Sequence, residues 1–321
     1  MSQLDVNIIA PLGYAGPNLV GDNNFVQVVD ATGDTVLKIP SGDNIAIGKD
    51  ALNTATTGQR NIAIGTSAAP NTNGDDNIAI GNEALLSSTG GGNIGIGRNS
   101  LKNVTTNSFN TAVGNNSLLN AGSVTTSAAF GSAAGSNITS GVSNAFLGSN
   151  TGAGFNSGDF NVFVGCQSAS GSNLQTGNNN ILISGWFVHP SSVNVNNEIT
   201  LGNSQHTVLR CAQTSITSLS DARDKKEIEE LPVGLDFVKG LKPVKFVWDD
   251  RDEFGKHDIK DFGFIAQDLK KSQEDTELAE TLKLVYESNP EKLEASYGKL
   301  VPILVKAIQE LTAKVEALEA K

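Results

Sequence analysis

Side chains that could do chemistry are few in this sequence of 321 residues. The two cysteines, Cys166 and Cys211, are too few for a disulfide framework. The three histidines, His189, His206 and His257, are scattered, and neither they nor the cysteines stand at metal-ligand spacing. We therefore expect no metal and no cofactor, and we expect both cysteines to be buried as small apolar side chains.

Glycoside hydrolysis is one chemistry that the carboxylates could serve, because it needs two of them roughly 5–10 Å apart. The candidates in the middle of the chain are Asp75, Asp76, Glu83 and Asp159, mostly in predicted turns. An enzyme that degrades polysaccharide is therefore kept as an alternative function.

The stretch "SDARDKKEI", residues 220–228, is the other place where chemistry could be sited. Taken from the residues alone, Ser220 or Asp221 is an N-cap followed by acidic and basic residues. A serine is a weak nucleophile until a base takes its proton. Lys225 could be that base only if burial or a neighbouring cation favoured its neutral form.

Charge divides the chain near Ser220. Residues 1–219 carry 17 charged side chains, whereas residues 220–321 carry 40. The net charge of −11 and the absence of a basic stripe argue against nucleic acid as a partner. The N-terminus has no secretion signal and no apolar run approaches about 20 residues, so we expect no membrane insertion.

A repeat fills the middle of the chain. "NIAIG" occurs three times, ending at Gly48, Gly65 and Gly81, and seven related copies follow as far as Gly202. The glycines are 16 or 17 residues apart except for one interval of 20. Each copy holds a short alternating strand, a second segment such as "DALN" and a polar turn. This pattern predicts about ten coils of a β-solenoid, each with two short strands and two turns.

Stacking has to supply the core, since one coil cannot bury its apolar face alone. Each coil offers only two or three inward aliphatic side chains, so we expect several chains to wrap together and share one interior. The repeated asparagine, as at Asn44, Asn61, Asn77 and Asn93, is either a functional ladder or a turn residue whose side chain satisfies backbone groups.

Two segments depart from the repeat. Residues 25–40 are predicted to form two strands around an "ATGD" turn. The coil at residues 179–202 is longer and holds Trp186, Phe187 and His189, which could contact a receptor sugar. The alternative is that this insertion caps the roll or packs against the next domain.

The C-terminal segment has the spacing of a coiled coil. Apolar residues stand at a and d positions, three and four residues apart. They are Val301, Leu304, Ile308, Leu311, Val315 and Leu318. Glu310 and Lys314 form an i,i+4 pair on the face expected to be exposed. An amphipathic helix that packs on its own domain is the alternative. The region before it is predicted to be mixed α and β.

Residues 42–203 resemble the head repeats of trimeric autotransporter adhesins. The shared pattern is "NxAIG" followed by "AL". The resemblance implies a left-handed β-roll that packs as a trimer.

Four motifs in the tail resemble the intramolecular chaperone domain of endosialidases, phage tail fibres and tailspikes, the peptidase S74 family. They are "SDARDKKEI" (220–228), "GLDFVKGLKPVKFVW" (234–248), "GFIAQDL" (263–269) and "SYGKLVPILVKAIQELTAKVEAL" (296–318). That family aligns three chains and then cuts itself off. The resemblance implies cleavage between Leu219 and Ser220 by a Ser220–Lys225 dyad.

The same resemblance assigns the chaperone motif to the following residues: Asp221, Arg223, Gly263, Phe264, Ile265, Ala266 and Gln267. It implies a homotrimeric viral fibre that is assembled in the host cytoplasm. Its N-terminus would join a virion tail or baseplate protein, and its roll would attach to a host glycan or protein receptor. The alternatives are a tailspike enzyme that degrades surface polysaccharide and a cellular adhesin-like surface fibre.

The predicted domains follow from these observations. They are an N-terminal β element (1–41), a β-roll (42–210), a linker (211–219), an α+β chaperone domain (220–300) and a coiled-coil helix (301–321).

Overall fold

The computed structural model describes most of the chain. The described residues are 43–53, 57–170, 174–188, 190–203, 205–206, 208–212, 217–218, 220–249 and 258–321, with the backbone of 27–29, 35–38 and 257. The chain divides into two units, Met1–Asn203 and Ser204–Lys321, each described by itself below.

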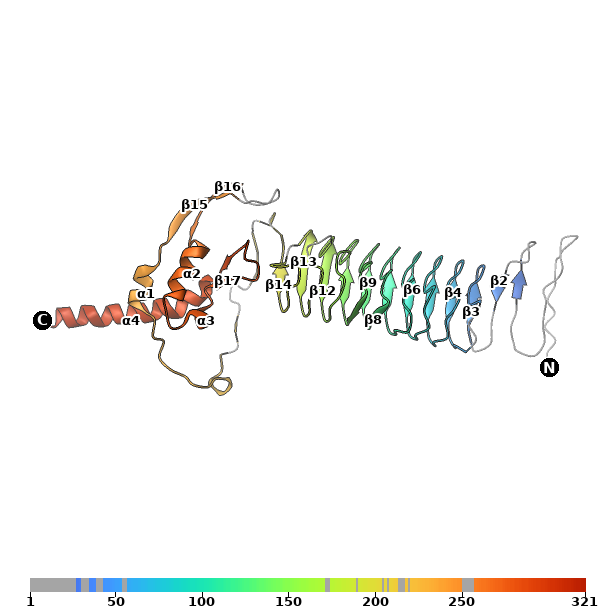
Figure 1. Cartoon of the computed structure of the whole chain (residues 1–321), viewed down its shortest axis with the longest axis horizontal. Coiled ribbons are helices and arrows are strands. Elements are labelled where there is room, and N and C mark those ends of the chain that lie inside the picture. The colour runs from blue at the N-terminus through green and yellow to red at the C-terminus, as the bar shows by residue number, and fades with distance from the viewer. Residues whose placement is uncertain are drawn as a thin grey trace, which may run out of the picture. The chain divides into compact units, whose positions relative to one another are not determined.

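Ten short parallel strands, one from each copy of the repeat, follow one another in a single sheet (Figure 1). They are β3 (Ile45–Ile47), β4 (Ile62–Ile64), β5 (Ile78–Ile80), β6 (Ile94–Ile96), β7 (Thr111–Val113), β9 (Ala128–Phe130), β11 (Ala145–Leu147), β12 (Val162–Cys166), β13 (Ile181–Trp186) and β14 (Ile199–Leu201). Equivalent residues pair, as Ala46 does with Ala63. The predicted β-solenoid is confirmed, and we call these coils the roll.

The second segment of each coil is a turn rather than the expected strand. In the first coil, Asp50 and Leu52 have φ values of 57° and 44°, which no extended strand allows. Neighbouring coils still bond there, since the Leu52 N–H donates to the Ala68 carbonyl at 3.1 Å. In the described part of the roll, β8 (Ser123–Thr125) and β10 (Ser140–Val142) form a second parallel pair, and isolated parallel bridges continue it to Ser157 and Thr176.

The interior of the roll is narrow. The central residue of each strand points inward, and in the early coils it is alanine, as at Ala46 and Ala63, both buried. Ile45 and Ile47 on either side of Ala46 face outward and are exposed. Leucines of the turn segment, such as Leu85, complete the core. The isoleucine columns therefore lie on the outer face of the sheet.

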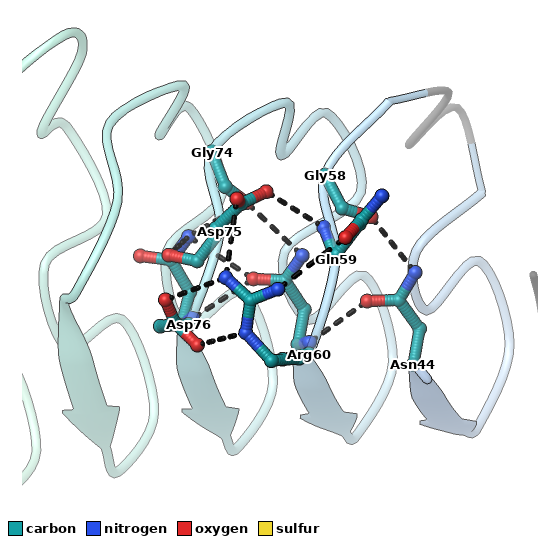
Figure 2. A network of polar contacts seen from close by, with 9 residues as sticks. Asn44, Gly58, Gln59, Arg60, Gly74, Asp75 and Asp76 are labelled. Atoms are coloured by element: carbon teal, nitrogen blue, oxygen red, sulfur yellow. Dashed lines mark hydrogen bonds and ion pairs between the residues drawn. The ribbon is translucent and has the colours of Figure 1, made fainter. Parts of the chain in front are cut away.

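An asparagine ladder runs along the inside of the roll (Figure 2). The Asn61 backbone N–H donates to Asn44 Oδ1 at 2.8 Å, and Asn44 Nδ2 donates to the Gly58 carbonyl at 2.9 Å. The ladder positions are all buried: Asn44, Asn61, Asn77, Asn93, Asn110, Ser127, Asn144, Asn161 and Asn180. These side chains satisfy backbone groups of their own turns and of the next coil.

The sheet begins with two antiparallel strands before the first coil. β1 (Gln27–Val29) pairs with β2 (Thr35–Lys38), and β2 pairs antiparallel with β3. The two strands fall where the sequence predicted them.

The C-terminal unit is a mixed α and β structure that ends in a long helix, as predicted. Its elements are η1 (Ala222–Asp224), α1 (Leu235–Gly240), β15 (Val244–Asp249), β16 (His257–Gly263), α2 (Ala266–Glu274), α3 (Ala279–Leu282), β17 (Val285–Tyr286), β18 (Glu294–Ala295), η2 (Tyr297–Lys299) and α4 (Leu300–Glu319). β15 and β16 form an antiparallel ribbon. β17 and β18 form a second, short pair.

The core of this unit is small. Its buried apolar residues in the described part are Leu269, Leu282, Leu284, Val285, Leu300 and Ile303. The first half of α4 contributes to it through Leu300 and Ile303, and Ala307 on the same face is also buried. From Leu311 onward every residue of α4 is exposed.

Candidate functional site

Ser220 and Lys225 lie within hydrogen-bond distance of each other. The Lys225 Nζ donates to Ser220 Oγ at 2.7 Å and lies 3.3 Å from the Ser220 carbonyl oxygen. This is the arrangement that a lysine base needs in order to take the proton of a serine hydroxyl. Leu219, on the other side of the expected scissile bond, lies outside the described residues.

A single 3₁₀ turn, η1, brings the two side chains together. Asp221 is its N-cap, because the Asp221 carboxylate accepts the N–H of Arg223 at 2.9 Å. The Lys225 N–H donates to the Ala222 carbonyl at 3.2 Å and closes the turn. The five-residue spacing of serine and lysine thus corresponds to one cap, one short turn and the residue that ends it.

Asp221 and Arg223 form an ion pair beside the dyad. The Arg223 Nη2 lies 2.6 Å from Asp221 Oδ2, and its Nε lies 3.1 Å from both carboxylate oxygens. The hydrogen bonds from the guanidinium and from the backbone N–H hold the pKa of Asp221 below its ordinary value. The same contact raises the pKa of Arg223. Asp221 is therefore a charged cap that fixes the turn carrying Lys225.

The dyad is open to solvent within a single chain, since both Ser220 and Lys225 are exposed. A lysine ammonium becomes a base more easily when it is withdrawn from water. The hydrogen-bond geometry is thus present in one chain, whereas the dry surroundings that favour proton transfer are not.

The segment Gly263–Gln267 forms the turn from β16 into α2, with Ile265 as the N-cap of α2. Its anchor is Tyr297, whose Oη accepts the N–H of Phe264 at 3.1 Å. The rings of Phe264 and Tyr297 meet edge to face with centroids 5.7 Å apart. A side chain at Gly263 would clash with Tyr297, since its Cβ would lie 2.6 Å from Oη. Ala266 and Gln267 open α2.

Helix α4 contacts the start of α1 and the segment that follows the dyad. Glu310 was expected on the exposed face with Lys314, but its carboxylate accepts the N–H of Leu235, at the start of α1, at 2.8 Å. Lys306 forms a 3.1 Å ion pair with Glu230, ten residues after Ser220. The sequence did not single out Tyr297 or Glu310 as anchors, although both belong to the motif at 296–318.

Comparison with known families gives one match. Residues 220–277 match a family model described as the chaperone of endosialidase, Peptidase_S74. The match begins at Ser220 and includes Lys225 and the turn at Gly263–Gln267. No curated protein matches the chain, and no solved structure does. The chaperone-type domain is therefore supported at sequence level for the first half of the C-terminal unit.

The coiled-coil positions of α4 are exposed in the single chain. Val301, Leu304 and Ile308 lie on a face next to the buried face of Leu300 and Ile303. Leu311, Val315 and Leu318 continue the exposed face to the end of the helix. One helix therefore has an inner face for its own unit and an outer apolar face left open.

The inserted loop of the long coil is held by contacts within the roll. Val188 is fully buried in the roll core, whereas Trp186 is exposed and stacks against Phe187 with ring centroids 5.0 Å apart. Glu198 takes the next ladder position, and its carboxylate accepts the Ser191 N–H at 3.0 Å. His189 lies outside the described residues. These contacts hold the inserted loop against its own coil.

The four candidate carboxylates are held in structural contacts. Arg60 reaches Asp76 at 2.6 Å and Asp75 at 3.2 Å across two neighbouring coils (Figure 2). Glu83 pairs with Lys102 at 2.5 Å. Asp159 accepts the N–H of Val142 at 2.8 Å.

Two further expectations can be compared with the described residues. Cys166 and Cys211 are exposed, so the expectation of burial was wrong. Cys166 follows Gly165 at the end of β12, where the chain turns outward. The described part of the chain contains no cluster of three or more metal-ligating side chains. None of its helices is long and apolar enough to cross a membrane.

Proposed function

We propose that this protein is a homotrimeric fibre of the viral tail-fibre type. Its C-terminal unit acts as an intramolecular chaperone that aligns three chains and then releases itself by cutting the bond between Leu219 and Ser220. The observation that carries the proposal is the 2.7 Å contact of Lys225 Nζ with Ser220 Oγ at the start of the chaperone-type match.

Trimer formation is supported by the apolar surface of the C-terminal unit. In its described part the large apolar side chains that are exposed outnumber those that are buried. Phe262 on the β15–β16 ribbon is 82% exposed, and an isolated two-stranded ribbon is marginally stable in water. Such surfaces mark places where other chains pack. The open face of α4, with Leu304 and Ile308, is the natural centre of that packing.

The roll offers a second surface for the same assembly. Its outward strand residues repeat in register along the sheet, as Ile45, Ile62, Ile78 and Ile94 do in consecutive coils. The interior of each roll is already filled by its own alanine, leucine and phenylalanine side chains. Chains would therefore not wrap around a shared interior, contrary to the expectation from the sequence. They would instead pack these isoleucine columns against one another.

The proposed cut is a two-step acyl transfer. Neutral Lys225 takes the proton of Ser220 Oγ, which attacks the Leu219 carbonyl carbon. The C–N bond then breaks, and the proton passes to the Ser220 nitrogen, so that an ester joins Leu219 to Ser220 Oγ. Water hydrolyses the ester and leaves a carboxylate at Leu219 and a free hydroxyl on Ser220. Neighbouring chains would supply the covering that favours the neutral lysine, which couples cutting to assembly.

The other parts take the roles expected of a fibre. The roll is a stiff rod, and the N-terminal segment joins a virion tail or baseplate protein. The rod attaches to a glycan or protein on the host surface. Slow folding of β structure with many non-local contacts gives the chaperone its physical purpose.

The test is expression of the full chain beside Ser220→Ala and Lys225→Met, read by mass under denaturing conditions. Wild type is expected to give fragments 1–219 and 220–321, and both variants are expected to stay whole. Ser218→Ala and Lys226→Met are matched controls, since each changes the same residue type next to the dyad and should still be cut. Uncut wild type would reject the protease and leave the chaperone role to be judged by trimer formation alone.

A further inference from the structure

One column of residues on the roll holds residue types that its backbone conformation does not favour. The residue just before each ladder position has a positive φ in all ten coils, between 52° and 69°. These residues are Asp43, Arg60, Asp76, Gly92, Phe109, Thr126, Ser143, Phe160, Asn179 and Asn197. Glycine, asparagine and aspartate adopt this conformation most readily, whereas it is unfavourable for a bulky side chain. Phe109 and Phe160 therefore occupy positions that the backbone alone would assign to other residues.

Neither phenylalanine contributes to the core. Phe109 is 69% exposed and Phe160 is 60% exposed. The ring of Phe109 lies over Gly92 in the preceding coil, where a Cβ would come within 2.7 Å of it. The glycine thus makes room for the ring, most of which stays exposed. A strained position filled by an exposed aromatic ring points to a function rather than to stability.

The two rings flank a pair of hydroxyl groups. Thr126 and Ser143 occupy the same column in the two coils between them, and both are exposed. Thr126 Oγ1 donates to the Thr125 carbonyl at 2.8 Å and lies 3.1 Å from Ser143 Oγ. Each hydroxyl keeps acceptor capacity for a further donor. Since coils repeat at about 4.8 Å, the two phenylalanines are separated by roughly 14 Å along the roll.

This part of the roll is electrically neutral. Residues 103–158 contain no Asp, Glu, Lys, Arg or His. The charges that border the stretch, Lys102 and Asp159, are held by Glu83 and by the Val142 N–H respectively. A ligand that depended on its charge would find no counter-charge in this stretch. The surface suits a neutral partner that combines apolar faces with hydroxyl donors.

We propose that Phe109, Thr126, Ser143 and Phe160 form a binding site for a neutral oligosaccharide of the host surface. The C–H face of a sugar ring would stack on each phenylalanine, and sugar hydroxyls would donate to Thr126 Oγ1 and Ser143 Oγ. The site spans a few sugar units. This inference rests on the proposed role in host attachment, and it places the contact in the middle of the roll rather than at Trp186.

The experiment measures binding of the full chain to immobilised neutral oligosaccharides of glucose, galactose, mannose and N-acetylglucosamine, with a sialylated trisaccharide for comparison. Phe109→Asn and Phe160→Asn keep the fold, because asparagine favours a positive φ. Each is expected to weaken binding about tenfold, as loss of a central aromatic contact does, and the double variant should not bind detectably. Phe109→Tyr keeps the aromatic face and should bind like wild type. Asn197→Ala, in the same column but outside the site, is the matched control.

Binding of the neutral ligand should change little with salt, because no charge pair contributes. The inference would be overturned if the double variant bound within about twofold of the wild-type affinity, because loss of both aromatic contacts should weaken binding far more than that. Preference for the sialylated probe, or no binding to any neutral probe, would also overturn it. A double variant that no longer forms trimers would assign the rings to a contact between chains instead. Cutting and trimer formation by wild type do not depend on this site, so failure here is separable from failure of the proposed function.

Discussion

Replacing one buried asparagine of the ladder tests how the roll is held together. Asn110 is fully buried, and its Oδ1 accepts the Ser127 N–H at 3.1 Å. Its Nδ2 donates to the Val124 carbonyl at 2.7 Å and to Asn93 Oδ1 at 3.2 Å. Asn110→Ala removes the partner of a buried N–H and of a buried carbonyl. Each such loss costs about 1–3 kcal/mol, so the free energy of unfolding should fall by about 2–6 kcal/mol per chain.

One ladder position already holds a serine, which indicates how a milder change would behave. Ser127 stands at a ladder position, where its Oγ accepts the Asn144 N–H and donates to the Thr125 carbonyl, at 3.1 and 3.2 Å. The serine of Asn110→Ser can make the same contacts, so this variant should lose much less free energy of unfolding than Asn110→Ala.

The assay is guanidinium unfolding at fixed protein concentration, with the midpoint compared at equal slope. Asn115→Ala is the control, because Asn115 is exposed and its φ is not positive. It should lie within about 0.5 kcal/mol of wild type. If Asn110→Ala were no less stable than Asn115→Ala, the ladder would not be satisfying buried backbone groups and the reasoning would be refuted.

Two further changes address the other contacts. Ile308→Lys combined with Leu311→Lys should convert a trimer into monomers, as measured by analytical ultracentrifugation, because charge on the open face of α4 opposes packing. Gln309→Lys, which is exposed on the same helix, should leave the trimer intact. A trimer that persists in the double variant would exclude this face as the contact between chains. Arg60→Met should lower the melting temperature at neutral pH, since the hydrogen bonds from Arg60 hold the pKa of Asp76 below its ordinary value. A carboxylate whose pKa is lowered by folding stabilises the fold at pH values above its unfolded-state pKa, and it loses that effect as pH falls through its folded-state pKa. The difference in melting temperature between variant and wild type should therefore vanish in strong acid. A difference that does not change with pH would contradict the ion-pair explanation.

The sequence repeat predicted the roll because its period can be read from the spacing of the glycines, without knowing how the coils pack. It did not show which face of the strand is inside. Alternation in "IAI" separates two faces, but both isoleucines could lie inside or outside. The narrow coil decides in favour of alanine, because turn leucines such as Leu85 already fill the interior. Those leucines adopt positive φ, which is also why the second segment is not a strand.

The site was predictable to a different degree. From the residues alone, the stretch at 220–228 is a helix cap, and the cap is Asp221. The nearness of Lys225 to Ser220 came from family resemblance, and one short turn explains it. Tyr297 and Glu310 were missed because they act on residues 33 and 75 positions away, Phe264 and Leu235. Spacing along the chain carries no signal for such contacts.

The energetics of one coil explain why assembly needs a template. The second coil places Arg60, Ser67 and Ala69 at positive φ, and such a conformation costs roughly 1–2 kcal/mol per residue. The compensating bonds run to the neighbouring coils on both sides, so a lone coil has the strain without the bonds. Coils should therefore form on an existing neighbour.

The core is not uniform along the roll. Early coils bury alanine, whereas later ones bury the aromatic cluster of Phe146, Phe155 and Phe163, with ring centroids 5.2–6.2 Å apart. The apolar area that can stabilise a first coil is therefore largest near the C-terminal end of the roll. That end is nearest in sequence to the proposed chaperone unit. A nucleus formed there would give each earlier, alanine-lined coil a finished edge to bond to, so the weakest coils would never have to fold first.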